Sequence, residues 1–228
     1  MQKQKLLSKS NPKLIKGQSL GYLSFGLHLS PANLSGYNVC ASASKGCKAA
    51  CLNSAGRGRF ERTGKARLKK TLFFKEDQKN FLIQLRKEIA AGIKYAEKNQ
   101  LIPCFRLNLT SDILWERLGI PQEFPTVQFY DYTKHFQRAM NYSKNLLPEN
   151  YHLTFSRSES NQKSVNAIVV DQLPVNVAVV FNKVPTIYKE RKVIDGDEHD
   201  LRFLDPEGVI VGLKPKGKAK KDTSNFVI

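Results

Sequence analysis

Residues 175–181, with the sequence VNVAVVF, form an almost unbroken apolar run. A strand of this composition is typical of a parallel sheet, where neighbouring layers cover both of its faces and leave no solvent-exposed side to carry polar residues. Parallel strands cannot be joined by tight hairpins, and the chain must cross back between them, usually through a helix. This run therefore predicts an α/β fold.

The remaining chain supplies further strands and the helices between them. Strands are expected at residues 20–29, 102–109, 127–130, 152–155 and 209–213, and helices at residues 65–99, 112–118, 135–142 and 161–171. The longest helix carries Phe81, Leu85 and Ile89 at helical spacing. Six strands separated mainly by helices predict a single α/β domain over residues 19–213, with a basic arm of little structure at 1–18 and a basic tail at 214–228. A partial barrel and a doubly wound sheet both fit.

Three of the four cysteines, Cys40, Cys47 and Cys51, lie in the loop after the first expected strand. If a helix begins near Lys48, Cys47 and Cys51 lie one turn apart on the same face. The small residues before Cys47 allow the loop to bring Cys40 towards them. Thiolates at this spacing are suitable ligands for an iron–sulfur cluster or for zinc.

The number of cysteines distinguishes an iron–sulfur site from a zinc site. Three thiolates suit a [4Fe–4S] cluster whose fourth iron is open or held by another group, whereas structural zinc normally takes four protein ligands. No histidine lies in the loop, and zinc remains the alternative metal. Cysteines that simply pack a turn are a further interpretation. Cys104 lies within an expected strand, where a buried apolar thiol is expected.

An odd trio of cysteines without an apolar leader indicates a reducing compartment, and disulfides are not expected. No apolar run is long enough to cross a bilayer, so we expect a cytoplasmic protein without a membrane partner.

The formal net charge of +17 is unevenly distributed, because Glu61 is the only acidic residue before residue 76. Such a field attracts polyanions through the release of condensed counterions. A solubilising surface or a surface that binds anionic lipid would have a similar composition. We expect nucleic acid, with DNA as the preferred partner. The candidate contacts are Lys45, Lys48, Arg57, Arg59, Arg62, Lys65, Arg67, Lys69, Lys70, Lys214, Lys216 and Lys218.

Polar residues follow most of the expected strands. In a parallel sheet these positions come together at one end, where α/β proteins commonly bind their ligands. The candidate ligand-binding residues are Asn108, Ser111, Asp112, Lys134, Ser156, Arg157 and Glu159. A separate acidic segment surrounds His199, and this segment is either a hard-metal or acid/base site or a solvated loop that pairs with arginines.

A six-unit α/β chain with three cysteines after its first strand resembles the radical S-adenosylmethionine superfamily. In that superfamily the cysteines hold a [4Fe–4S] cluster whose open iron binds S-adenosylmethionine, inside a partial (β/α)6 TIM-like barrel. The spacing here is C-x6-C-x3-C rather than CxxxCxxC, and Leu109-Thr110-Ser111-Asp112 stands where a glycine-glycine-acid signature is expected. The resemblance implies a partial barrel and S-adenosylmethionine as a candidate cofactor.

Four blocks, at residues 38–58, 106–113, 130–134 and 195–203, resemble the phage and plasmid "gene product 88"-like family. This resemblance implies a mobile-element protein with an iron–sulfur site in a bacterial host cell. The leading hypothesis is an iron–sulfur protein that binds nucleic acid in replication or processing. The alternatives are a minimal radical S-adenosylmethionine enzyme and a zinc-stabilised nucleic-acid-binding module.

Overall fold

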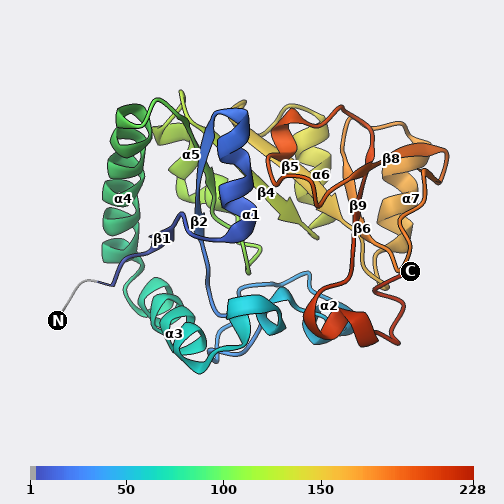
Figure 1. Ribbon diagram of the computed structural model, residues 1–228, viewed down its shortest axis with the longest axis horizontal. Coiled ribbons are helices and arrows are strands. Elements are labelled where there is room, and N and C mark those ends of the chain that lie inside the picture. The colour runs from blue at the N-terminus through green and yellow to red at the C-terminus, as the bar shows by residue number, and fades with distance from the viewer. Residues whose placement is uncertain (1–3) are drawn as a thin grey trace.

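A computed structural model describes residues 4–228, and nine strands in this part of the chain form one sheet (Figure 1). The strands are β1 (Leu7–Ser8), β2 (Tyr22–Leu27), β3 (Ile102–Arg106), β4 (Gln128–Thr133), β5 (Tyr151–Ser156), β6 (Val177–Val180), β7 (Ile187–Tyr188), β8 (Arg191–Asp195) and β9 (Ile210–Leu213). The α-helices are α1 (Pro12–Ile15), α2 (Lys45–Ala49), α3 (Glu61–Glu76), α4 (Gln78–Lys98), α5 (Ile120–Glu123), α6 (Phe136–Ser143) and α7 (Gln162–Val170).

The order of the sheet is β1-β2-β3-β4-β5-β6-β9-β8-β7. The six strands expected from the sequence, β2 to β6 and β9, are neighbours in chain order and pair in parallel. β8 joins β9 in parallel, while β1 and β7 are antiparallel additions at the edges. The structure confirms a single α/β domain with a mostly parallel sheet.

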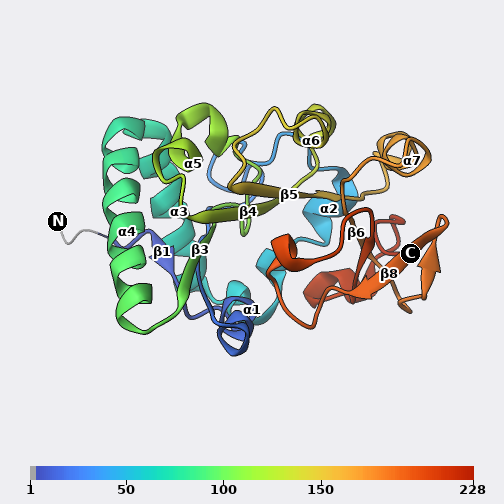
Figure 2. The same ribbon diagram turned by 90° about the horizontal axis from the view of Figure 1, so that it is seen from above.

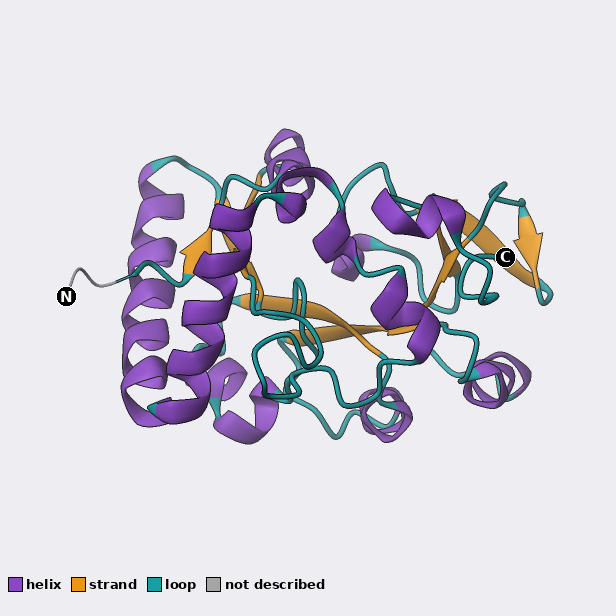
Figure 3. Cartoon of the chain, turned by 90° about the horizontal axis from the view of Figure 1, so that it is seen from below, coloured by secondary structure: helices purple, strands orange, loops and turns teal. Residues whose placement is uncertain are grey.

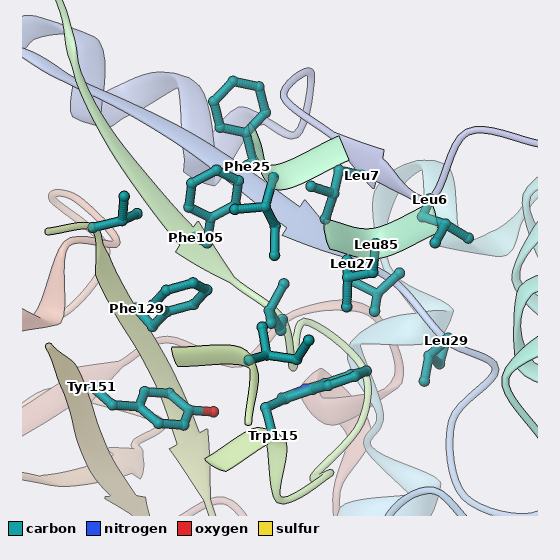
Figure 4. Packing of buried hydrophobic residues seen from close by; sticks show 14 of the residues in the cluster. Leu6, Leu7, Phe25, Leu27, Leu29, Leu85, Phe105, Trp115, Phe129 and Tyr151 are labelled. Atoms are coloured by element: carbon teal, nitrogen blue, oxygen red, sulfur yellow. The ribbon is translucent and has the colours of Figure 1, made fainter. Parts of the chain in front are cut away.

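Helices α4, α5, α6 and α7 cover one face of the sheet, and α1 lies on the other (Figure 2). The core on the first face contains a row of aromatic rings from adjacent strands (Figure 4). Phe105 lies 5.6 Å from Phe129, and Phe129 lies 6.3 Å from Tyr151, measured between ring centroids. Because side chains alternate along a strand, Cys104 belongs to a different cluster, with Tyr130 and Leu201.

The acidic segment around His199, between β8 and β9, was expected to be either a metal or acid/base site or a solvated loop. It is more buried than a solvated loop. Asp200 and Arg202 are 1% and 0% exposed. Asp200 accepts a hydrogen bond from Arg106 Nη1 at 2.6 Å, which confirms the expected pairing with an arginine. Leu201 and Phe203 pack against tyrosines of the sheet, so that residues 200–203 belong to the core, whereas Glu198 and Leu204 are exposed.

Both chain termini contain more structure than the sequence indicated. Leu7 of β1 pairs with Leu27 of β2, and Leu6 is fully buried. At the other end, Val227 forms an isolated parallel bridge with Val180 and is buried. The expectation of an arm with little structure was therefore wrong for residues 6–15. Leu7 gains its order from pairing with β2, and Val227 from the bridge to the end of β6, neither of which sequence periodicity reports.

The long expected helix is divided into α3 and α4 at Asp77. The Asp77 side chain accepts a hydrogen bond from the Asn80 main-chain N–H at 3.3 Å and caps α4. The helix expected at residues 112–118 is a 3-10 turn, η4 (Trp115–Leu118), followed by α5. No helix within residues 4–228 has the length and apolar character needed to cross a membrane.

Candidate functional site

A cavity of about 190 Å³ lies where the parallel strands end. Its walls come from the segments that follow β2, β3, β4, β8 and β9, from the last residues of β5 and β6, and from Phe226 near the end of the chain. Figure 3 views the molecule from the side on which these connecting loops lie. The expected convergence of the strand ends is therefore present, and five of the seven candidate ligand-binding residues line it. These five are Asn108, Ser111, Asp112, Lys134 and Ser156.

The three cysteines of the loop after β2 all line this cavity. Cys47 lies within α2, whose N-cap residue Ser44 accepts a hydrogen bond from the Cys47 main-chain N–H at 3.1 Å. Cys51 lies beyond the end of α2 and begins a 3-10 turn, η2 (Leu52–Ser54). The expectation of a helix beginning near Lys48 was therefore wrong, because Lys48 lies in the last turn of α2.

Main-chain N–H groups point at two of the sulfurs. Ala32 N lies 3.4 Å from Cys40 Sγ, and Asn53 N lies 3.5 Å from Cys51 Sγ. The pKa of Cys40 is raised to about 11, mainly by burial and to a smaller extent by negative charge on Asp112, Cys51 and Cys47. Burial also raises the pKa of Cys51. The three thiols are thus electrostatically coupled and, as free thiols, Cys40 and Cys51 favour the protonated form.

No three histidine, cysteine or carboxylate side chains among residues 4–228 surround a single point closely enough to hold one metal ion. A zinc ion requires its donors within about 2.0–2.3 Å of one centre. A [4Fe–4S] cluster places each thiolate on a different iron and therefore holds its cysteines farther apart. The three cysteines therefore do not converge on a single ion in this arrangement, and the identity of a bound metal group stays a prediction.

Two cations act on Cys51, and neither has a carboxylate partner in the described part of the chain. Arg67 of α3 is 8% exposed, its Nη1 donates to Asn53 Oδ1, and its Nε has no hydrogen-bond partner. Lys134 donates from Nζ to Ser156 Oγ at 2.7 Å and lies 5.6 Å from the centre of the Phe226 ring. A buried charge without a partner is costly.

The other buried arginines have carboxylates or main-chain oxygens as partners, although Arg106 Nε and Arg202 Nε and Nη1 also lack a hydrogen bond to the described residues. Arg106 and Arg138 pair with carboxylates at 2.6 and 2.8 Å, and Arg202 lies 3.2 Å from Asp205. Arg157 donates to the main-chain oxygens of Asn225 and Phe226. Within residues 4–228, Arg67 has neither kind of partner: its guanidinium donates to the Asn53 side chain, and the charged group that acts on its pKa is Cys51.

Two of the expected ligand-binding residues have structural contacts that fix the cavity wall. Asn108 Oδ1 accepts hydrogen bonds from Ser111 Oγ at 2.8 Å, from the Ile113 N–H at 2.9 Å and from Trp115 Nε1 at 3.1 Å. Asp112 accepts from Thr133 Oγ1 at 2.9 Å and from the Lys134 N–H at 2.8 Å. These contacts hold the loop after β3 against the end of β4.

Arg157 and Glu159 do not line the cavity. Glu159 Oε1 accepts from the Gly46 N–H at 2.7 Å, and Oε2 accepts from Ser44 Oγ at 2.8 Å, so that Glu159 anchors the first turn of α2. Gly46 must lack a side chain here, because a Cβ would lie 2.2 Å from Ser224 Oγ and 2.7 Å from Glu159 Oε2. Arg157 instead holds the chain segment that carries Phe226, which is a wall residue.

Arg106 and Phe226, which sequence reasoning missed, line the cavity together with Tyr132 and with Asp197 of the acidic segment around His199. The guanidinium carbon of Arg106 lies 4.5 Å from the centre of the Tyr132 ring. Asp197 accepts from Lys216 Nζ at 2.5 Å and from the Lys214 N–H at 3.0 Å. The signal for Arg106 was a charged residue inside an otherwise apolar strand, IPCFR.

Most of the candidate nucleic-acid contacts are at the surface. Exposed positions are Lys45, Lys48, Arg57, Arg59, Arg62, Lys65, Lys69, Lys214 and Lys218, and Lys216 is half-buried. Arg67 and Lys70 differ from this expectation. Arg67 is buried, and Lys70 Nζ donates to the Leu6 main-chain oxygen at 2.6 Å, with its pKa lowered to about 8 mainly by burial.

The comparison with protein families gives a match over residues 5–228 to the family described as gene product 88. No curated protein and no solved structure matches the chain. The family expected from the four sequence blocks is therefore confirmed, and the likeness to the radical S-adenosylmethionine superfamily stays a prediction.

Replacing Glu159 with alanine removes the anchor of the cysteine helix. We expect Glu159→Ala to lower the free energy of unfolding by about 1–3 kcal/mol, because two donors lose a charged acceptor. Urea denaturation measures this change, and amide exchange at Gly46 should become faster. Glu97→Ala, at an exposed position of α4, is the control. Unchanged exchange at Gly46 would contradict the assigned role of Glu159.

Proposed function

The chain belongs to the gene product 88 family, and we propose that it is an iron–sulfur protein that binds nucleic acid. One observation carries the proposal. Three thiols line one cavity, and the two cations that act on Cys51 (Arg67 and Lys134) lack carboxylate partners. A [4Fe–4S] cluster on Cys40, Cys47 and Cys51 has a net negative charge. It would supply the missing partner of Arg67 and Lys134.

The chain's own groups fit such a cluster in two further ways. Ala32 and Asn53 direct N–H groups at Cys40 and Cys51, and hydrogen bonds of this kind stabilise charge on cluster sulfurs. The bond from Glu159 holds α2 so that Cys47 faces the cavity. When bound, the cluster would supply one-electron chemistry or a rigid cross-link between the loop and its surroundings. Zinc is the weaker alternative, because it requires closer ligands.

Binding of nucleic acid, with DNA as the expected polymer, is supported by the surface around the cysteine loop. Arg57 and Arg59 lie in a short 3-10 turn, η3 (Gly56–Arg59), and Arg62 lies in the first turn of α3. All three are exposed. Charges presented in this way contact phosphates without reading base sequence, as a role in replication or processing of a mobile element requires.

A second candidate, a radical S-adenosylmethionine enzyme, is favoured by the cavity itself. We infer a partial (β/α)6 TIM-like barrel from the six parallel strands in chain order, and the cavity lies beside the cysteines at its carboxyl end. Lys134 and Ser156 offer donors there to a cofactor carboxylate. Asn108 and Asp112 would shape the wall, since their oxygens are already engaged.

The cluster is tested by metal analysis of protein prepared without oxygen. We expect iron and acid-labile sulfide in equal amounts, and Cys40→Ser, Cys47→Ser and Cys51→Ser each to lose most of both, because a three-thiolate site has no spare ligand. Cys104→Ala is the matched control, since Cys104 is buried in a different cluster, and it should keep the wild-type iron content. Colourless, iron-free wild-type protein would rule out the proposal.

Binding to a DNA oligonucleotide should weaken steeply as salt increases. If 6–10 phosphates are contacted, affinity falls roughly 10³–10⁵-fold between 50 and 200 mM salt. The triple variant Arg57→Gln, Arg59→Gln and Arg62→Gln should reduce the slope of log affinity against log salt by about one for each lost contact. Fluorescence anisotropy measures both effects.

The control for this experiment removes the same charge elsewhere. Lys87, Lys94 and Lys98 are exposed on α4, and their triple replacement by glutamine should leave the slope nearly unchanged. An affinity indifferent to salt, or equal effects of the two triple variants, would count against the assigned surface.

The second candidate predicts that reduced protein cleaves S-adenosylmethionine. We expect 5′-deoxyadenosine from anaerobic wild-type protein with dithionite, and none from Cys47→Ser. Chromatography of the reaction mixture measures the product. An unaltered cofactor with an intact cluster would reject the enzyme while leaving the iron–sulfur protein in place.

A further inference from the structure

We propose that Arg67 and Asn53 together raise the reduction potential of the cluster from outside its ligand set. This inference rests on the proposed iron–sulfur site and assigns to two residues a role that the ligand set alone does not contain. Both residues act through Cys51, and we therefore describe them as positioning residues.

Arg67 and Asn53 form a short relay that ends on a cluster ligand. The Arg67 guanidinium donates from Nη1 to Asn53 Oδ1, and the main-chain N–H of the same asparagine points at Cys51 Sγ, 3.5 Å away. Cys51 is the N-cap of η2 and its sulfur is the acceptor for that cap. The guanidinium therefore fixes the residue whose N–H reaches the sulfur.

The surrounding backbone keeps Asn53 in place. A Cβ at Gly58 would lie 2.6 Å from the Asn53 main-chain oxygen, so that only a glycine lets η3 approach this closely. The Ser54 hydroxyl donates to the Cys51 main-chain oxygen at 2.8 Å and closes the same turn. These contacts leave the Asn53 N–H little freedom to turn away from the sulfur.

The positive charge of Arg67 is what changes the reduction potential. Arg67 is 8% exposed, forms no ion pair with a carboxylate in residues 4–228, and keeps its proton at any working pH. Reduction adds one negative charge to the cluster. A fixed positive charge and an N–H···S hydrogen bond both stabilise that added charge, and a poorly solvated site screens them weakly. Both effects favour the reduced form.

Lys134 is the other cation near Cys51, and it differs from Arg67 in two ways. Lys134 is only half-buried, and its ammonium already donates to Ser156 Oγ. Solvent screens a half-buried charge more strongly than a buried one. We therefore assign the larger contribution to Arg67.

The test is a redox titration of purified, cluster-loaded protein followed by electron paramagnetic resonance. Arg67→Gln should retain the iron content but shift the midpoint potential to a more negative value. Arg67→Lys keeps the charge and should recover most of the wild-type potential. Lys75→Gln removes an exposed charge from the last turn of α3 and should leave the potential unchanged.

Asn53→Ala provides a second route if Arg67→Gln fails to assemble the cluster. This variant removes the side-chain acceptor while Arg67 keeps its charge, and a smaller negative shift is expected. A fully loaded Arg67→Gln or Asn53→Ala protein with the wild-type potential would overturn this inference and leave the iron–sulfur proposal intact. Wild-type protein that binds no cluster would overturn both.

Discussion

Parallel pairing in chain order is the constraint on which the site depends. β2 to β6 and β9 run in the same direction, so every segment that follows one of them emerges at the same end of the sheet. Cys40, Thr110, Lys134 and Ser156 are separated by long stretches of chain and still line one cavity. The loop of cysteines has little regular structure of its own. Its position comes from the strand before it and from the Glu159 carboxylate, which lies in the segment after β5 and accepts from the Gly46 N–H.

Electrostatic balance distinguishes this end of the molecule from the rest. Arg106 of β3 and Arg138 of α6 are buried, and each has a carboxylate in direct contact. Beside the cysteines the balance is reversed, because Arg67 is buried and positive while the Cys40 and Cys51 thiols favour the neutral form. A folded protein rarely leaves a cation in this condition. On the proposed function, the cluster would supply the negative charge that Arg67 lacks.

Much of the sheet could be predicted from the sequence, because strands such as β6 show a clear apolar run and their order follows from short crossovers. The edge strands could not, since β1 contains two residues and its order comes from Leu27 beside it. The division at Asp77 was hidden by an apolar spacing that continues across both helices. At the site, sequence located the strand ends but not the direction of each side chain. Glu159 was therefore expected in the cavity, whereas it turns to the main chain of α2.

Helix α3 presents different residues on opposite sides, with Arg62, Lys65 and Lys69 in solvent and Arg67 buried beside Cys51. The helix is only about 10 Å across, which is close to the Debye length of about 8 Å at physiological salt. On the proposed function, a polyanion lying along α3 would sense the oxidation state of the cluster on the other side of the helix. Reduction of the cluster would then lower the affinity for the polymer. By thermodynamic reciprocity, bound polymer would lower the reduction potential of the cluster.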